Sequence, residues 1–214
     1  MREVRAGPRF VEEATDLLFQ TLSERLMEQP RVSLALSGGS TPWPVFRRLA
    51  GAPIDWQRVD IYQVDERVAP LGDPARNLTG LAESLLDRAA ADVHPMPVES
   101  VDLARAAKEY AAALPARFDV VHLGLGDDGH TASLVPGDPV LDVTDSLVGI
   151  TQPYRGHPRM TLTFPALARS HVVVWIVAES GKSSMLRRLR DADRSIPAGR
   201  VPQSNAILVT DEKD

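Results

Sequence analysis

Residues 32–42 read VSLALSGGSTP, and this stretch decides the fold class of the chain. The segment from Val32 to Leu36 is apolar or small and predicts a short buried strand, which the glycines after it break at once. Pro42 suits the first turn of a helix, and we expect that helix to run to about Leu49. A strand, a glycine loop and a helix in this order form the repeating unit of an α/β fold.

Further strands and helices alternate along the chain. The helix expected at residues 10–28 has apolar side chains spaced three to four apart, which places them on one face. Several strands are apolar throughout, as in a parallel sheet covered on both faces. Strands are expected at residues 59–64, 118–123, 160–164, 171–178 and 206–209, and further helices at 77–88 with Asn77 as its cap, at 102–114 and from about 180–182. The sequence predicts a three-layer open α/β sandwich, with a mostly parallel sheet covered by helices on both faces.

The composition is that of an ordinary globular protein, because 43% of the 214 residues are apolar and 25% are charged. No repeat or long linker divides the sequence, so we expect a single domain over residues 1–214. No apolar run reaches the roughly 20 residues of a membrane span, and residues 1–5 lead into no hydrophobic signal region. We therefore expect a cytoplasmic protein that does not act on a membrane.

Charge and cysteine content exclude other classes of function. The net charge of −5 argues against nucleic acid as the main partner, although an anionic small molecule can bind where basic residues gather. The absence of cysteine excludes disulfides, thiolate catalysis and Cys-ligated metals. The five histidines are scattered along the sequence and argue against a structural zinc site.

The loop between the first buried strand and its helix has the residue types of a phosphate site. Glycines allow main-chain N–H groups to approach an anion, hydroxyls add donors, and the helix N-terminus adds a favourable dipole. The residues concerned are Gly38, Gly39, Ser40 and Thr41. The alternative is a tight turn without a ligand. The glycine spacing differs from that of a Walker loop, and no Lys-Ser or Lys-Thr pair follows.

A second glycine-rich segment follows the strand at 118–123. Gly124, Gly126 and Gly129 match the G-x-G-x-x-G dinucleotide fingerprint, but Pro136 follows too soon for the long helix that holds a pyrophosphate. The remaining feature is a turn that presents Asp128 and His130 at the end of a buried strand. A histidine there can act as a general base, oriented by the carboxylate. The alternative is a capping aspartate beside an exposed histidine.

Three further groups of charged residues are candidates for the same site. Asp65, Glu66 and Arg67 end a predicted strand, so that Asp65 and Arg67 point to one side and could face a common cleft. Arg159 begins a strand, and Lys182 lies at a helix N-terminus, where the dipole disfavours a cation. That placement suggests an anionic ligand. The alternatives are a solvated charge cluster and ordinary surface charges.

These motifs together resemble the 6-phosphogluconolactonase family, whose relatives include the glucosamine-6-phosphate deaminases and isomerases. The resemblance covers nearly the whole chain, and its motifs occur in the family's order. They are residues 37–42, 65–68 with Asn77 downstream, 124–137, 159–163 and 181–182. The chain departs from the family at Arg76, where a serine is frequent, and in residues 204–214, which lack the usual tryptophan and final helix.

The resemblance implies a role for each candidate residue. Gly38 to Thr41 would hold the phosphate of a sugar, helped by Arg159 and Lys182. His130 would be the catalytic base, supported by Asp128, and Arg67 would contact the substrate near its reacting end. Asp65 is placed among the substrate-binding residues.

The implied activity is hydrolysis of 6-phospho-D-glucono-1,5-lactone to 6-phospho-D-gluconate, in the oxidative branch of the pentose phosphate pathway, by general-base activation of water. A monomer that needs no metal or organic cofactor is expected. No Gly-x-Ser-x-Gly elbow supports a serine nucleophile. The alternatives are an aminosugar-phosphate deaminase or isomerase of the same fold, and a sugar-phosphate sensor, for which we would expect an attached DNA-binding module.

Overall fold

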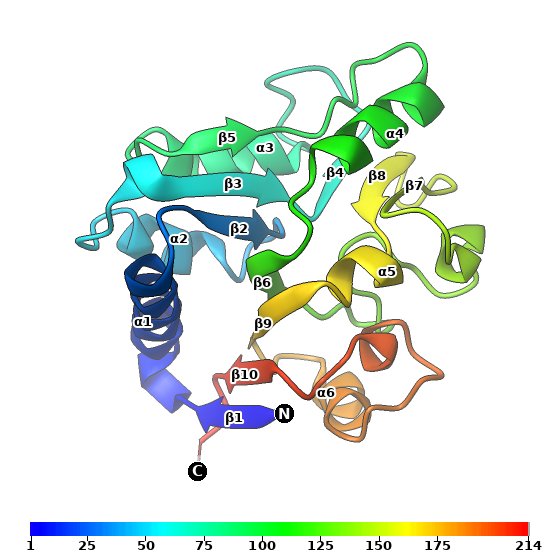
Figure 1. Cartoon of the computed structure of the whole chain (residues 1–214). Coiled ribbons are helices and arrows are strands. Elements are labelled where there is room, and N and C mark those ends of the chain that lie inside the picture. The colour runs from blue at the N-terminus through cyan, green and yellow to red at the C-terminus, as the bar shows by residue number, and fades with distance from the viewer. Residues whose placement is uncertain (214) are drawn as a thin grey trace.

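Seven strands form one parallel sheet in the computed structural model, which describes residues 1–213 (Figure 1). Their order across the sheet is β1-β10-β9-β6-β2-β3-β5, and every neighbouring pair is parallel. The strands are β1 (Arg2–Arg5), β2 (Val32–Leu36), β3 (Val59–Gln63), β5 (Asp92–His94), β6 (Phe118–Leu123), β9 (Ser170–Val177) and β10 (Ala206–Thr210).

Helices cover both faces of this sheet. Figure 1 shows α1 and α2 on one side of the strands and α4, α5 and α6 on the other. The helices are α1 (Phe10–Glu28), α2 (Trp43–Leu49), α3 (Asn77–Leu81), α4 (Leu103–Ala113), α5 (Phe164–Leu167) and α6 (Ser183–Arg190), with a π-helical turn at Ala82–Leu86 after α3. In β6, Val120 packs into the core beside α1 and α2, whereas its neighbour Val121 packs into the core beside α4. Both faces are therefore buried, and the predicted three-layer sandwich is confirmed.

A second, smaller sheet was not expected. It is antiparallel, in the order β4-β8-β7, and consists of β4 (Asp65–Arg67), β7 (Val148–Ile150) and β8 (Arg159–Leu162). The strand predicted at 160–164 belongs to this sheet and not to the parallel one. In the pairing of β4 with β8, Arg67 lies directly opposite Arg159. Two candidate residues separated by about ninety positions are thus neighbours.

The strand order reverses beside β2. From β2 the chain continues outward through β3 and β5, and it then returns to β6 on the other side of β2. Open α/β sheets bind their ligands at such a reversal, beyond the carboxyl ends of the strands. The glycine loop after β2 and the glycine-rich turn after β6 flank this point.

Several boundaries differ from those expected. Asn77 is the first residue of α3 and not its cap, because Glu66 accepts the main-chain N–H groups of Asn77 and Leu78 instead. The α-helical part of that segment ends at Leu81. The helix expected from about 180 begins at Ser183. Near the C-terminus β10 pairs on both edges, with β1 and β9, and Arg190 bonds both Glu3 and Glu212.

Candidate active site

A pocket of about 230 Å³ opens where the loops after β2, β3, β6 and β9 converge. All the residues that the sequence suggested for binding or catalysis line it, except Asp128, which lies behind His130 and contacts that residue. The lining candidates are Gly38, Gly39, Ser40, Thr41, Asp65, Arg67, His130, Arg159 and Lys182. The fold therefore brings the separate motifs to one place, at the strand-order reversal.

His130 lies in the turn after β6 and is held by Asp128. The Nδ1 atom of His130 lies 2.5 Å from Oδ1 of Asp128, and the main-chain N–H of His130 donates to the same oxygen at 3.0 Å. The hydroxyl of Tyr154 donates to the other oxygen, Oδ2, at 3.1 Å. An ionised carboxylate only accepts hydrogen bonds, so Nδ1 carries the proton of the neutral ring and Nε2 keeps its lone pair. Nε2 is therefore the basic position.

The carboxyl group of Asp128 stays ionised at neutral pH. Partial burial alone would raise its pKa, but the main-chain hydrogen bond from His130, the charge of a protonated His130 ring and the hydroxyl of Tyr154 together lower the pKa. The ionised form can stabilise the imidazolium that forms when His130 accepts a proton.

Gly126 gives the imidazole its room. A Cβ atom added at position 126 would lie 2.1 Å from Nδ1 of His130, which no real side chain tolerates. Gly126 also accepts and donates within the turn, since its N–H donates to the carbonyl of His130 and its carbonyl accepts from Gly129. The glycines of this segment thus shape a turn around His130. Turns follow Gly129, and the next helical element is the 3₁₀ turn at Pro139–Asp142, so the context of a dinucleotide fingerprint is missing.

Two facing arginine side chains give the pocket positive charge. Nη1 of Arg67 donates to Oδ1 of Asn77 at 3.1 Å, and Nη1 of Arg159 donates to the hydroxyl of Ser133 at 3.3 Å. Both acceptors are neutral. Burial lowers the pKa of Arg159, and the charge of Arg67 lowers it further, although the charge of Asp65 acts in the opposite direction. Like charges facing each other across two strands destabilise the free protein, so an anion between them would be bound favourably.

The glycine loop is shaped by its neighbour Asn77. A Cβ atom at position 38 would lie 2.1 Å from Oδ1 of Asn77, so that only glycine permits this contact. The helix that follows, α2, has seven residues. Its dipole is correspondingly small, and the positive charge of the pocket comes mainly from the lining side chains of Arg67, Arg155, Arg159 and Lys182.

Asp65 lies at the floor of the pocket and is buried. Its Oδ2 accepts a hydrogen bond from the hydroxyl of Ser133 at 2.5 Å, and its Oδ1 accepts one from Nδ2 of Asn77 at 3.2 Å. Burial raises the pKa of Asp65, although the hydrogen bond from Ser133 and the charge of Arg159 act in the opposite direction.

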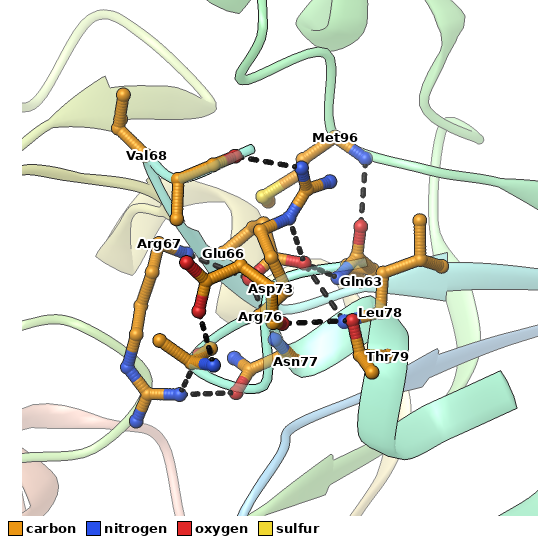
Figure 2. Close-up of polar contacts among 12 residues, drawn as sticks. Gln63, Glu66, Arg67, Val68, Asp73, Arg76, Asn77, Leu78, Thr79 and Met96 are labelled. Carbon is orange, nitrogen blue, oxygen red and sulfur yellow. Dashed lines mark hydrogen bonds and ion pairs between the residues drawn. The ribbon is translucent and has the colours of Figure 1, made fainter. Parts of the chain in front are cut away.

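Glu66 does not line the pocket and lies in a buried network of polar contacts (Figure 2). Its carboxylate accepts a hydrogen bond from Nε2 of Gln63 at 2.8 Å. It also accepts hydrogen bonds from the main-chain N–H groups of Arg67, Asn77 and Leu78. Nε of Arg76 lies 3.1 Å from Oε2 of Glu66, and both side chains are almost fully buried. The network fixes the main chain on both sides of the pocket-lining residues Arg67 and Asn77. The polar triplet at 65–67 is therefore not a solvated charge cluster, and Arg76, where the family frequently has serine, is buried.

Sequence reasoning assigned no part in binding or catalysis to three residues that bond the candidate residues. Tyr154, Ser133 and Asn77 each bond a candidate residue, namely Asp128, Asp65 and Arg67. The partners lie 26, 68 and 10 positions away along the chain. Local spacing carries no signal for contacts of this kind, and only Asn77 stood in a motif. Among residues 1–213 no group of three or more His, Asp or Glu side chains could hold a metal ion.

Comparisons with known proteins agree with this geometry. The family model described as glucosamine-6-phosphate isomerases/6-phosphogluconolactonase matches residues 7–209. A 6-phosphogluconolactonase of Synechocystis sp. is 33% identical over 95% of this chain and 91% of its own length. A 6-phosphogluconolactonase of Rhizobium meliloti is 38% identical over 77% of this chain and 76% of its own length.

Solved structures show the same fold. A 6-phosphogluconolactonase of Thermotoga maritima superposes with a TM-score of 0.90 at 28% identity and covers 99% of both chains. A monomeric glucosamine-6-phosphate deaminase also superposes, with a TM-score of 0.86, but at 15% identity that likeness shows the fold alone. No helix among residues 1–213 is long and apolar enough to cross a membrane. Family match, identity and coverage agree, and the chain belongs to the glucosamine-6-phosphate isomerase/6-phosphogluconolactonase family.

Proposed function

We infer that this protein is a 6-phosphogluconolactonase, a hydrolase that opens the ring ester of 6-phospho-D-glucono-1,5-lactone to 6-phospho-D-gluconate. One observation carries the inference. A histidine base bound to an ionised aspartate lies in the same pocket as a glycine loop and four cationic side chains. The base suits the activation of water beside the lactone carbonyl of this substrate. The cations suit the phosphate group at its other end.

Nε2 of His130 accepts a proton from water as the water oxygen attacks the lactone carbonyl. The carbonyl oxygen then becomes an oxyanion, which needs hydrogen-bond donors. We assign that role to Arg67 or to main-chain N–H groups of the Gly124–His130 turn. Collapse of the tetrahedral intermediate breaks the bond between the carbonyl carbon and the ring oxygen, and the imidazolium returns its proton to that oxygen. Asp128 holds the ring in the required tautomer throughout.

The phosphate group serves as the handle that positions the carbonyl. We assign it to the loop from Gly38 to Thr41 together with Arg159 and Lys182, because these groups line one pocket and offer main-chain, hydroxyl and cationic donors. Asp65, which is partnered by Ser133 and Asn77, is assigned to the sugar hydroxyls. Binding energy from the handle can be used at the reacting centre, so its loss reduces turnover as well as affinity.

The second candidate is a deaminase or isomerase acting on an aminosugar phosphate, since a deaminase shares the fold. Two assays separate the candidates. The first follows acid release from freshly generated 6-phosphogluconolactone, with spontaneous hydrolysis subtracted, and we expect enzymatic turnover. The second measures ammonia release from glucosamine 6-phosphate. Ammonia release without lactone hydrolysis would replace our assignment with the second candidate.

Four properties stay predictions. We propose that the protein works as a monomer, that residues 1–214 fold as a single domain, that nucleic acid is no partner, and that the protein resides in the cytoplasm. Light scattering after size-exclusion chromatography measures the first, and a single cooperative unfolding transition tests the second. The net charge of −5 supports the third. Fractionation of the source cells tests the fourth.

A further inference from the structure

Tyr154 contacts three groups of the site from a tight turn between β7 and β8. The main chains of Tyr154 and His157 exchange two hydrogen bonds, at 2.9 and 3.4 Å, and the residues between them, Arg155 and Gly156, have φ angles of +50° and +90°. Positive φ at both central positions is the geometry of a type I′ turn. The start of this segment is anchored as well, since the N–H of Gln152 donates to Asp138 at 2.9 Å. The Tyr154 side chain therefore projects from a fixed base.

The hydroxyl and the ring of Tyr154 contact different partners. The hydroxyl donates to Oδ2 of Asp128, which leaves Oδ1 to the main-chain N–H and the ring of His130. The ring of Tyr154 meets that of His130 edge to face, with 5.6 Å between centres. Two arginines also lie over this ring, with Cζ of Arg159 5.1 Å and Cζ of Arg155 5.2 Å from its centre. Nη2 of Arg159 donates to the Tyr154 carbonyl at 3.4 Å.

We propose that Tyr154 is a positioning residue for the lactonase reaction, which fixes the plane of the Asp128 carboxylate through its hydroxyl and the Arg159 guanidinium through its ring. The proposal rests on the function inferred above. One side chain contacts both the aspartate that supports the base and an arginine that is assigned to the phosphate group. A carboxylate held only at Oδ1 can turn about its bond to Cβ, and the imidazole then follows it. A second bond, at Oδ2, removes that freedom.

The hydroxyl is available for this task over the working pH range. Partial burial and the negative charge of Asp128 raise the pKa of Tyr154, so the phenol keeps its proton. The charged groups nearest to it are Asp127, Asp128, Arg155 and Arg159, and Arg155 bonds Asp127 at 3.2 Å. A protonated phenol can only donate to the carboxylate of Asp128, which favours the ionised acceptor.

Two substitutions separate the hydroxyl from the ring. Tyr154→Phe removes only the donor, and we expect kcat to fall about tenfold with an unchanged KM, because a hydrogen bond to a charged group is lost at the base. The acidic limb of the kcat/KM profile should move to lower pH, because a carboxylate that is free to turn stabilises the imidazolium less. Tyr154→Leu also removes the ring, and KM should then rise about threefold as Arg159 loses its cation–π contact.

The matched control is Tyr62→Phe, which removes the hydroxyl of a tyrosine in β3 whose ring stacks on His94. This variant should retain wild-type kcat, KM and pH profile. Thermal unfolding of all variants shows whether the fold is retained. The double variant Asp128→Asn/Tyr154→Phe should be no slower than Asp128→Asn alone, since Tyr154 acts through Asp128.

A readout independent of turnover distinguishes this proposal from the proposed function. The ¹⁵N chemical shifts of the His130 ring report which nitrogen carries the proton, and Tyr154→Phe should reduce the population with the proton on Nδ1. A Tyr154→Phe variant with wild-type kcat, pH profile and ring shifts would overturn the proposal. A wild-type protein that fails to hydrolyse the lactone would contradict the proposed function, while the ring shifts would still decide the role of Tyr154.

Discussion

His122 should make the protein sensitive to mild acid. This histidine lies in β6 with no exposed surface, and its Nδ1 accepts the N–H of Ser37 at 3.3 Å, at the start of the glycine loop. Burial lowers the pKa of His122 to about 3, compared with an ordinary value of 6.5. Between these two values the unfolded chain binds a proton that the folded chain does not. The free energy of unfolding therefore falls as the pH falls below 6.5.

The size of this effect follows from the two pKa values. Between pH 7 and pH 5 the unfolded-state protonation of His122 costs about 2 kcal/mol of stability, at ~1.4 kcal/mol for each pH unit below 6.5. For a chain of this length that loss lowers Tm by about 4–8 °C. His122→Asn removes the titrating group and keeps an acceptor for the N–H of Ser37. Between pH 7 and pH 5 the Tm of His122→Asn should therefore fall by about 4–8 °C less than the Tm of the wild type.

Calorimetry or circular dichroism of both proteins in matched buffers from pH 7 to pH 5 measures the difference. The comparison uses slopes, so a constant loss of stability in His122→Asn does not affect it. His171→Asn is the control, since His171 is a half-buried histidine of the neighbouring strand β9 and its Tm curve should differ less from that of the wild type. Parallel curves for wild type and His122→Asn would refute the reasoning.

Three further predictions concern the pocket. If Arg67 stabilises the oxyanion, Arg67→Lys should lower kcat about 10–100-fold with little change in KM. The reason is that an ammonium cannot reproduce the planar fork of donors of a guanidinium. A wild-type kcat would show that the role of Arg67 is structural. Lys182→Ala should raise KM about tenfold, and inorganic phosphate should compete with the substrate of the wild type; absence of competition would place the phosphate site elsewhere. Gly126→Ala should lower kcat about 100-fold, because its Cβ would lie 2.1 Å from Nδ1 of His130; unchanged turnover would show that the imidazole moves without consequence.

The parallel sheet could be predicted because its central strands are apolar on both faces, and a pattern of that kind is visible in the sequence alone. The strand at Phe118–Leu123 and the helix at Phe10–Glu28 have the predicted bounds. The short edge strands β1 and β5 were missed, since three or four mostly polar residues carry no periodic signal. The antiparallel sheet was also missed: the strand at 160–164 was predicted, but its pairing with β4 and β7 depends on tertiary contacts that carry no local signal, and so does the pairing of Arg67 with Arg159.

The candidate site was predictable as far as its motifs extend. Gly38 to Thr41, His130 and Lys182 line the pocket because loops at the carboxyl ends of parallel strands meet at one edge of the sheet. The supporting contacts were not predictable. Glu66 was given no role of its own, and its burial depends on Gln63, on Arg76 and on main-chain N–H groups that only the tertiary fold assembles.

The most direct test of the account is the rate of acid release from freshly generated 6-phosphogluconolactone by the wild type and by His130→Ala at pH 7, each with spontaneous hydrolysis subtracted. The account predicts rapid hydrolysis by the wild type and a kcat lower by about 10²–10⁴ in the variant, the usual contribution of a positioned general base. Bound phosphate should stabilise both proteins equally, which shows that the pocket of the variant is intact. Wild-type turnover in His130→Ala would contradict the central claim that this histidine activates the attacking water.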